Sequence, residues 1–269
     1  MKARSLFYML AVAVAVLFYT QAAAQSHYEH VLTVDRYYPN DGDCYDGILF
    51  QFHSQNHKPE GDYNGCSVID MESRRLIQFI DLGFNQNFHN SSITFGKKKF
   101  SMGDRFPLLY ASENYAPNEY YKVIVYRVME TGDQNAPYSL EVVQTINMPD
   151  PHENEILYPH CFYDRDGNCF WIEAYSLDKK ENVYTRYKLP RFKADSTVDM
   201  GKPLRTFRLP RDPKTDQAIY KRGDRMYQVV GARKTGKLRV IDVNEGTLLK
   251  VINLNDMGLI HEPEAVFFH

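Results

Sequence analysis

Helical signal is what this sequence lacks most. No segment shows a sustained 3.6-residue apolar period, and the hydrophobic runs are short, rich in β-branched residues and bounded by turn residues. An excess of charge of one sign is also missing, since 32 basic residues are balanced by 34 acidic ones. A near-neutral balance indicates neither a polybasic surface for nucleic acid nor the acidic excess of a disordered chain. These absences leave a globular all-β protein.

Recognisable catalytic signatures are absent as well. The sequence contains no G-x-S-x-G nucleophile elbow, no glycine-rich loop that would cradle a phosphate and no Cys/His nucleophile pattern. Residues 164–168 (DRDGN) resemble a calcium loop but lack the glutamate that completes an EF-hand, so they predict a hairpin turn. Lys97, Lys98 and Lys99 predict a solvated loop, with a surface contact as the alternative.

The N-terminus predicts export. Lys2 and Arg4 precede an uncharged apolar run of 14 residues, 6–19, and residues 22–24 (AAA) supply a small-residue cleavage site. Because a spanning helix needs roughly 20 apolar residues, a signal peptide of residues 1–24 is favoured over a membrane anchor. The mature chain, 25–269, would then be one domain of 269 − 24 = 245 residues. We expect it in the periplasm or outside the cell, with no transmembrane segment after cleavage.

The cysteines leave two alternatives open. All four lie in the exported part of the chain, where disulfides persist, and they allow three connectivities. Cys161 and Cys169 flank the predicted hairpin turn and could be bonded. A two-residue turn at Asp166 and Gly167 would instead place Cys169 opposite Asp164. The other alternative is a set of buried free thiols. The four are Cys44, Cys66, Cys161 and Cys169.

An internal repeat organises the chain. Residues 237–254 (KLRVIDVNEGTLLKVINL) alternate with a period of two on both sides of a tight turn, as two antiparallel strands do. Residues 66–82 match this unit, and two weaker copies lie between them. Strand-only repeats of this length are typical of β-propeller blades. The spacings are 56, 62 and 54 residues when measured between Ile69, Val125, Tyr187 and Ile241.

The number of blades follows from the innermost strands. Each blade needs about four strands, so the segment ahead of each repeat is expected to be the innermost one. A fifth such segment, 261–268, has no repeat after it, and residues 30–36 (HVLTVDR) are the available partner for it. We therefore predict an all-β propeller of about five blades, closed by the N-terminal strand, in preference to a β-sandwich. The other innermost segments are 43–46, 89–95, 158–163 and 217–221.

These motifs resemble a known group of proteins. The repeat is similar to the YVTN-type β-propeller repeat of exported bacterial proteins. Residues 89–96 and 106–110, then 226–231 and 262–265, are similar to a family of uncharacterised secreted propeller-like proteins of gut bacteria. The resemblance covers most of the mature chain and implies a propeller fold and export, but no particular activity. The family usually continues past the Glu-Pro-Glu segment at 262–264 with a further strand.

Polar residues are expected where the innermost strands line the central channel. They could hold a small polar ligand or a divalent cation, or they could hydrogen-bond the exposed backbone and channel water. Trp171, in an apolar strand, is expected in the core. The candidate ligand-binding residues at the channel mouth are Asp43, Asp46, His89, Asn90, His160, Gln217, Glu262 and Glu264. The metal-binding candidates among them are His89, His160, Glu262 and Glu264.

The sequence thus favours an exported, non-catalytic propeller that binds a small ligand or a protein partner through one face of its ring. The alternative is a metal-dependent hydrolase or lyase with a divalent cation in the central channel. A third hypothesis is a structural component of a surface assembly. No certain cofactor follows from the residues, and nucleic acid is not an expected partner.

Overall fold

The structure is a computed structural model that describes residues 38–57, 61–85, 90–113, 121–149, 156–213, 216–232 and 234–259. These residues form seventeen strands and one short 3₁₀ helix, η1 (Leu254–Met257). Among them, no helix is long and apolar enough to cross a membrane. The predicted signal peptide and the predicted closing segments, 30–36 and 261–268, lie outside the described residues.

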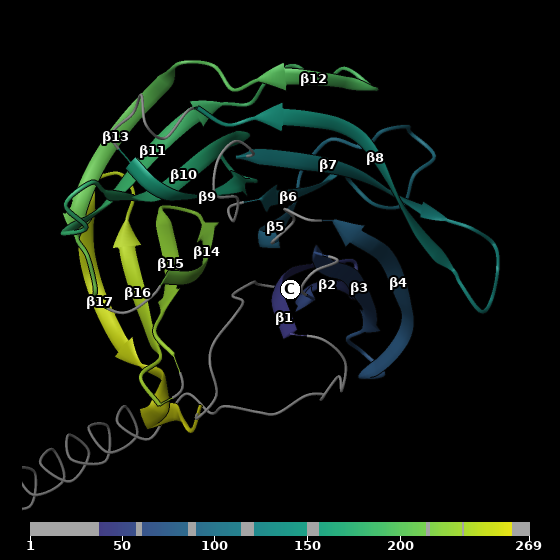
Figure 1. The fold of residues 1–269 in the computed structure, drawn as a ribbon, viewed down its shortest axis with the longest axis horizontal. Coiled ribbons are helices and arrows are strands. Elements are labelled where there is room, and N and C mark those ends of the chain that lie inside the picture. Colours follow the sequence, from purple (N-terminus) through teal and green to yellow (C-terminus); the bar gives the residue numbers. More distant parts are fainter. Residues whose placement is uncertain are drawn as a thin grey trace, which may run out of the picture.

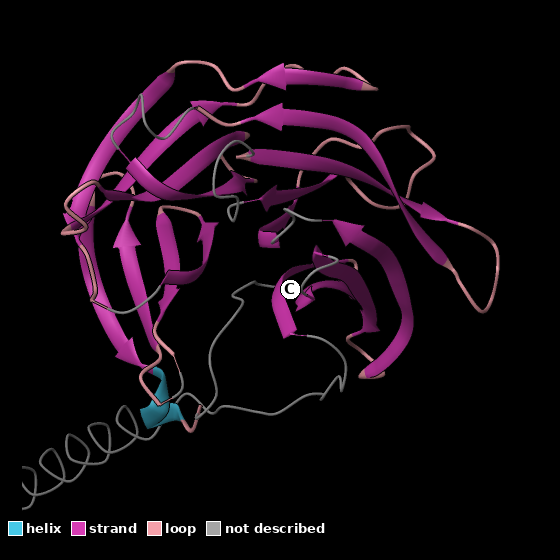
Figure 2. Ribbon diagram, viewed as in Figure 1, coloured by secondary structure: helices cyan, strands magenta, loops and turns pink. Residues whose placement is uncertain are grey.

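The strands form four sheets that are antiparallel except for one outer strand, and these sheets appear as separate fans in Figures 1 and 2. Blade 1 contains β1 (Tyr38–Tyr45), β2 (Ile48–His57), β3 (Gly61–Asp70) and β4 (Arg75–Asn85). Blade 2 contains β5 (Asn90–Phe95), β6 (Leu109–Glu113), β7 (Lys122–Glu130) and β8 (Tyr138–Asn147). Blade 3 contains β9 (Ile156–Asp164), β10 (Cys169–Ser176), β11 (Glu181–Lys188) and β13 (Pro203–Pro210). Blade 4 contains β14 (Asp216–Arg222), β15 (Arg225–Val230), β16 (Lys237–Asp242) and β17 (Thr247–Asn253).

The first strand of each sheet lies at the centre of the ring. β5 packs against β1 and β9, and β14 packs against β9 and β5. This arrangement is a β-propeller, so the predicted all-β class and the four predicted innermost segments are confirmed. The prediction of about five blades is not met, because the described part of the chain forms four. Its one additional strand, β12 (Ser196–Asp199), adds in parallel to the outer edge of β8 and widens blade 2 rather than starting a new blade.

The repeat seen in the sequence corresponds to a repeated irregularity between the third and fourth strands of every blade. There the fourth strand carries one extra residue, a β-bulge, which bends the outer edge of the blade. The bulge faces Ile69 in blade 1, Tyr187 in blade 3 and Ile241 in blade 4. In blade 2 it faces Tyr126. The predicted equivalence of Val125 is therefore wrong by one residue.

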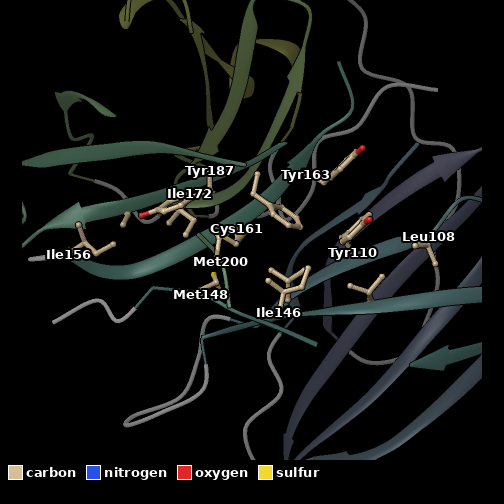
Figure 3. Close-up of a cluster of buried hydrophobic side chains, with 14 of the residues drawn as sticks. Leu108, Tyr110, Ile146, Met148, Ile156, Cys161, Tyr163, Ile172, Tyr187 and Met200 are labelled. Carbon is tan, nitrogen blue, oxygen red and sulfur yellow. The ribbon is translucent and has the colours of Figure 1, made fainter. Parts of the chain in front are cut away.

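The hydrophobic core lies between the blades. Figure 3 shows the cluster between blades 2 and 3, where the rings of Tyr110 and Tyr163 stack with centroids 4.9 Å apart. Between blades 3 and 4, Trp171 packs edge-on against Phe207 and is 2% exposed, which confirms its predicted place in the core. Aromatic side chains thus fill the wedge-shaped spaces that flat blades leave around a ring.

All four cysteines are buried free thiols. Cys161 belongs to the cluster between blades 2 and 3, whereas Cys169 belongs to the cluster between blades 3 and 4. Their side chains leave the same sheet on opposite sides, so a disulfide between them is excluded. Cys169 pairs with Asp164 across the hairpin turn, as the alternative prediction required.

The two ends of the ring carry different connections. The connections from one blade to the next and the hairpins between second and third strands lie at one end, which we call the crossover face. The connections between first and second strands and between third and fourth strands lie at the other end, which we call the hairpin face. Because strands in a blade run up and down alternately, this division follows from the strand order alone.

Candidate functional site

The innermost strands present one edge to the centre of the ring. Backbone N–H groups on such an edge need acceptors when they are buried. In this protein, side chains of the preceding blade supply them. At the boundary between blades 1 and 2, Asp41 Oδ2 accepts from the backbone nitrogen of Ile93 at 2.7 Å. Asp43 Oδ2 accepts from that of Phe95, also at 2.7 Å.

The same arrangement recurs at the following blade boundaries. Ser112 Oγ in β6 accepts a hydrogen bond from the backbone nitrogen of Cys161 in β9 at 3.2 Å. The hydroxyl oxygen of Tyr175 in β10 accepts one from the backbone nitrogen of Asp216 in β14 at 3.3 Å. At all three described boundaries, a side chain of one blade therefore accepts a hydrogen bond from the main chain of the first strand of the next blade.

Asp43 also forms a central ion pair. Arg165, in the turn after β9, donates from Nη2 to Asp43 Oδ2 at 2.5 Å and from Nε to the carbonyl oxygen of Phe95 at 2.8 Å. Burial outweighs this pairing and raises the pKa of Asp43 to about 6. Burial and then the Asp43 charge raise the pKa of Tyr220 in β14 to about 12. Groups from all four blades therefore surround one carboxyl.

Each innermost strand is bulged near its first residue, at the crossover face. Bulges re-aim side chains and interrupt pairing, and they are common beside binding sites. Polar residues lie at or beside all four bulges, so the crossover face brings polar groups from every blade toward the axis. The pairing shifts between Pro39 and Gly42 in β1, Asn90 and Ser92 in β5, Leu157 and His160 in β9, and Asp216 and Ala218 in β14.

Glu113 is an acid at this face whose pKa lies near neutrality. It is the last residue of β6, is 5% exposed, and pairs across the sheet with Lys122 in β7. Burial raises its pKa to about 7, and the Lys122 charge opposes that rise only in part. Glu113 can therefore take up or release a proton close to neutral pH.

A buried acid pair lies between blades 3 and 4. Glu173 and Asp216 are 1% and 4% exposed, and the amide nitrogen of Asn182 donates to both. Burial, followed by the Asp216 charge, raises the pKa of Glu173 well above its usual range. Burial also raises the pKa of Asp216. Because two adjacent buried carboxyls cannot both ionise, Glu173 holds the proton and Asp216 carries the charge.

Arg239 balances that charge. It is 2% exposed and donates to Asn182 Oδ1 at 3.0 Å, to Gln228 Oε1 at 2.9 Å and to the carbonyl oxygen of Pro210 at 2.8 Å. Gln228 in turn donates to Asp216 Oδ1 at 3.0 Å. One ionised carboxylate and one guanidinium sum to zero charge, which allows a satisfied network to be buried. This network joins blades 3 and 4 and is closed to solvent.

The predicted site residues divide between the two faces. His160, 8% exposed, lies opposite Glu173 across β9 and β10, so both side chains leave the sheet on the same side. Gln217 sits in the bulge of β14 at the crossover face and donates to the carbonyl oxygen of Gly231 at 3.1 Å. Asp46 lies instead in the β1–β2 turn on the hairpin face, where Arg105 donates to it at 2.9 Å. Asp43 is buried between these ends.

The remaining predicted residues fall in parts of the chain that are not described. His89, Glu262 and Glu264 lie outside the described residues, and only the backbone of Asn90 is described, as the first residue of β5. Within the described ranges, no group of three or more His, Cys, Asp or Glu side chains is placed to hold a metal ion. Of the four predicted metal ligands, the structure therefore describes His160 alone.

Several central residues were missed by the sequence reasoning. Arg239 lies in a strand that is mostly half-buried (KLRVID) and gave a weaker signal. Glu173 could have been found, because it is a charged residue inside a run that is otherwise buried (CFWIEAY). A charge in such a run predicts a buried partner. Arg165 and Glu113 gave no such signal, since each sits where a strand meets a loop and a charge is ordinary there.

Comparisons with known proteins give weak similarities. No protein-family model matches the chain, and no curated protein matches it. The β-propeller domain of Cps50 (Swd1) from Myceliophteria thermophila is similar at 9% identity and a TM-score of 0.42, over 88% of this chain and 92% of that one. A GH43 β-1,3-galactosidase is similar at 11% identity and a TM-score of 0.39, over 80% of this chain and 75% of that one. AztD from Citrobacter koseri follows at 11% identity and a TM-score of 0.32, over 85% and 49%. These similarities are too weak to assign a function.

Proposed function

We propose that this protein is an exported, non-catalytic binding module that holds a small polar ligand or a protein partner at the crossover face of its propeller. The observation that carries the proposal is the bulge at the crossover end of all four innermost strands. One bulge would be an accident of local packing. Four at equivalent positions bring main-chain and side-chain polar groups toward one axis, as a binding surface requires.

The charges at this face support a polar partner. Gln217 and the near-neutral acid Glu113 come from different blades. Asp216 of the buried acid pair adjoins Gln217 in β14, so the strand that presents Gln217 is held by a hydrogen-bonded network rather than by a loop. A site on rigid elements loses less conformational entropy on binding than one on flexible loops.

We further propose that a segment outside the described residues closes the ring beside blade 1. Each of the three large core clusters joins two adjacent blades, whereas the small cluster of Cys44, Leu49 and Ile69 contains residues of blade 1 alone. This side of blade 1 needs an apolar partner, which no described blade supplies. The predicted closing strand, residues 30–36, is the candidate for this partner. The resemblance of the repeats to secreted propeller-like proteins of gut bacteria, and the predicted signal peptide, support export.

Closure is tested by truncation. A mature chain that starts at Tyr37 should melt well below one that starts at Gln25, because loss of the closing strand exposes the apolar side of blade 1. Equal melting temperatures would contradict the closure proposal and leave the binding proposal standing.

Binding is tested by thermal melting of the mature chain against a panel of sugars, amino acids, dipeptides, Ca²⁺, Mg²⁺ and Zn²⁺, with a chelator as a separate arm. A ligand of the native state raises the melting temperature with the logarithm of its concentration. Gln217→Ala should weaken that shift, whereas Asp46→Asn, on the opposite face, should preserve it. A shift that Asp46→Asn removes and Gln217→Ala leaves intact would contradict the crossover face as the site. Turnover of any compound in the panel would contradict a non-catalytic module.

A further inference from the structure

The hairpin face carries a basic surface built from two loops that are far apart in the sequence. The first is residues 96–108, between β5 and β6, and the second is residues 189–193, after β11. We call the two together the basic loop pair. Both connect strands at the end of the ring opposite to the crossover face, so this surface is separate from the proposed binding site.

Aromatic contacts hold the basic loop pair in place. The rings of Phe100 and Phe192 meet edge to face with centroids 5.9 Å apart, and Lys98 Nζ lies 4.6 Å over the Phe192 ring. Arg127 lies 4.6 Å over Phe100. The backbone of Lys98 accepts from Leu108 N at 2.7 Å, which closes the base of the first loop. The loops are therefore fixed relative to each other before any partner arrives.

The charge of this surface is positive. Its exposed basic residues are Lys97, Lys98, Lys99, Arg191 and Lys193. Asp104, the acid on these loops, is neutralised by Arg127 at 2.8 Å, and the exposed acids beside the loops are Asp166 and Asp195. Five cations against two exposed anions stand out on a chain with a net charge of −2. Their attraction extends over about a Debye length, roughly 8 Å at physiological salt.

An apolar side chain projects from the same loop. Met102 is 101% exposed at the tip of a turn in which Asp104 N donates to the carbonyl oxygen of Ser101. It is the most exposed of the large hydrophobic residues in the described chain. When such a loop meets a surface that is anionic outside and apolar beneath, the methionine side chain leaves water, which is favourable in free energy.

We propose that the basic loop pair docks the protein on an anionic phospholipid surface, with the cations on the lipid phosphates and Met102 at the boundary of the acyl layer. Each lysine near such a surface strengthens attraction severalfold, and salt weakens it. A soluble polyanion would use the same lysines but would gain nothing from Met102. This difference selects the membrane over an acidic polymer.

The test is co-sedimentation of the mature chain with vesicles of phosphatidylcholine alone and of phosphatidylcholine mixed with phosphatidylglycerol. Binding should need phosphatidylglycerol and fall as salt rises. Replacing Lys97, Lys98 and Lys99 together with Gln should weaken partitioning on the order of 100-fold, because each lysine contributes about fivefold. Met102→Ser should weaken it roughly tenfold.

The matched control replaces three exposed lysines of the crossover face, Lys179, Lys180 and Lys234, with Gln and should leave partitioning unchanged. Equal losses in the control and in the loop variant would show that net charge, not this surface, governs binding and would overturn the proposal. So would an unchanged Met102→Ser variant, which would point to an acidic polymer, or sedimentation with neutral vesicles to the same extent.

Discussion

Glu113 should make the stability of this protein fall as the pH rises toward neutrality. Its pKa rises from 4.5 to about 7 on folding, chiefly because the carboxyl is buried. A group whose pKa is raised contributes its full stability below the unfolded value, and that contribution is lost as the pH rises through the folded value. The unfolding free energy therefore decreases as the pH rises from 4.5 to about 7.

The size of the effect follows from the shift. The difference of 7 − 4.5 = 2.5 pH units corresponds to at most about 3 kcal/mol of unfolding free energy at 1.36 kcal/mol per unit. Because Glu113 ends its strand beside the Lys122 charge, about 1 to 3 kcal/mol is a fair range. The variant Glu113→Gln keeps the shape of the protonated acid but does not titrate. Above pH 7 it should melt about 3 to 10 °C higher than the wild type.

Differential scanning calorimetry of both proteins across this pH range measures the difference. The two melting temperatures should agree at pH 4 and diverge as the pH rises. Glu72→Gln, at an exposed turn position in blade 1, is the matched control and should follow the wild type. If Glu113→Gln loses stability in parallel with the wild type up to pH 8, the carboxyl is ionised at no cost and the reasoning is refuted.

Three other perturbations test the remaining network. Arg239→Met should cost about 3 to 5 kcal/mol in a urea titration, because the Asp216 charge loses its counterion inside the protein; a cost below 1 kcal/mol would show that the network is not closed to water. Arg165→Ala should cost about 2 to 4 kcal/mol, and the deficit should grow through pH 6 as Asp43 ionises without its partner; a deficit that is constant with pH would exclude this pairing. Dithiothreitol should leave the melting temperature unchanged, since all four cysteines are free; a drop would reveal a disulfide.

The sequence predicted the architecture well where side chains alternate between water and core. The third and fourth strands carry the period-two pattern, and the strands ahead of them could be placed because a blade needs about four. The sequence did not show that Tyr126, rather than Val125, is the equivalent position in blade 2. The bulge inserts a residue into the fourth strand and leaves the composition of the third strand unchanged. The fourth strand of blade 4 departs from this alternation, because its apolar residues Leu248 and Leu249 are 40% and 48% exposed at the outer edge of the sheet.

The candidate site was harder to predict, because alternation says which residues leave a strand on one side but not which blade they meet. Asp46 and Gln217 were both predicted to line the channel mouth. Asp46 follows the end of β1 and Gln217 lies near the start of β14, so the two residues reach opposite faces of the ring. The partnership of Glu173 with Asp216 links positions 43 residues apart in the chain. Only the packing of blade 3 on blade 4 brings the two together.

The hydrogen bonds between blades place few demands on the side chains of the strand that donates. Acceptors such as Asp41 and Ser112 bind the main chain of the next innermost strand, and a main-chain donor is the same whatever side chain accompanies it. Mutations can therefore accumulate along an innermost strand without loosening the ring, provided that the accepting side chain on its neighbour is retained. The side chains of such a strand can therefore change. A ring assembled in this way can alter the residues that face its axis and still keep the hydrogen bonds between its blades.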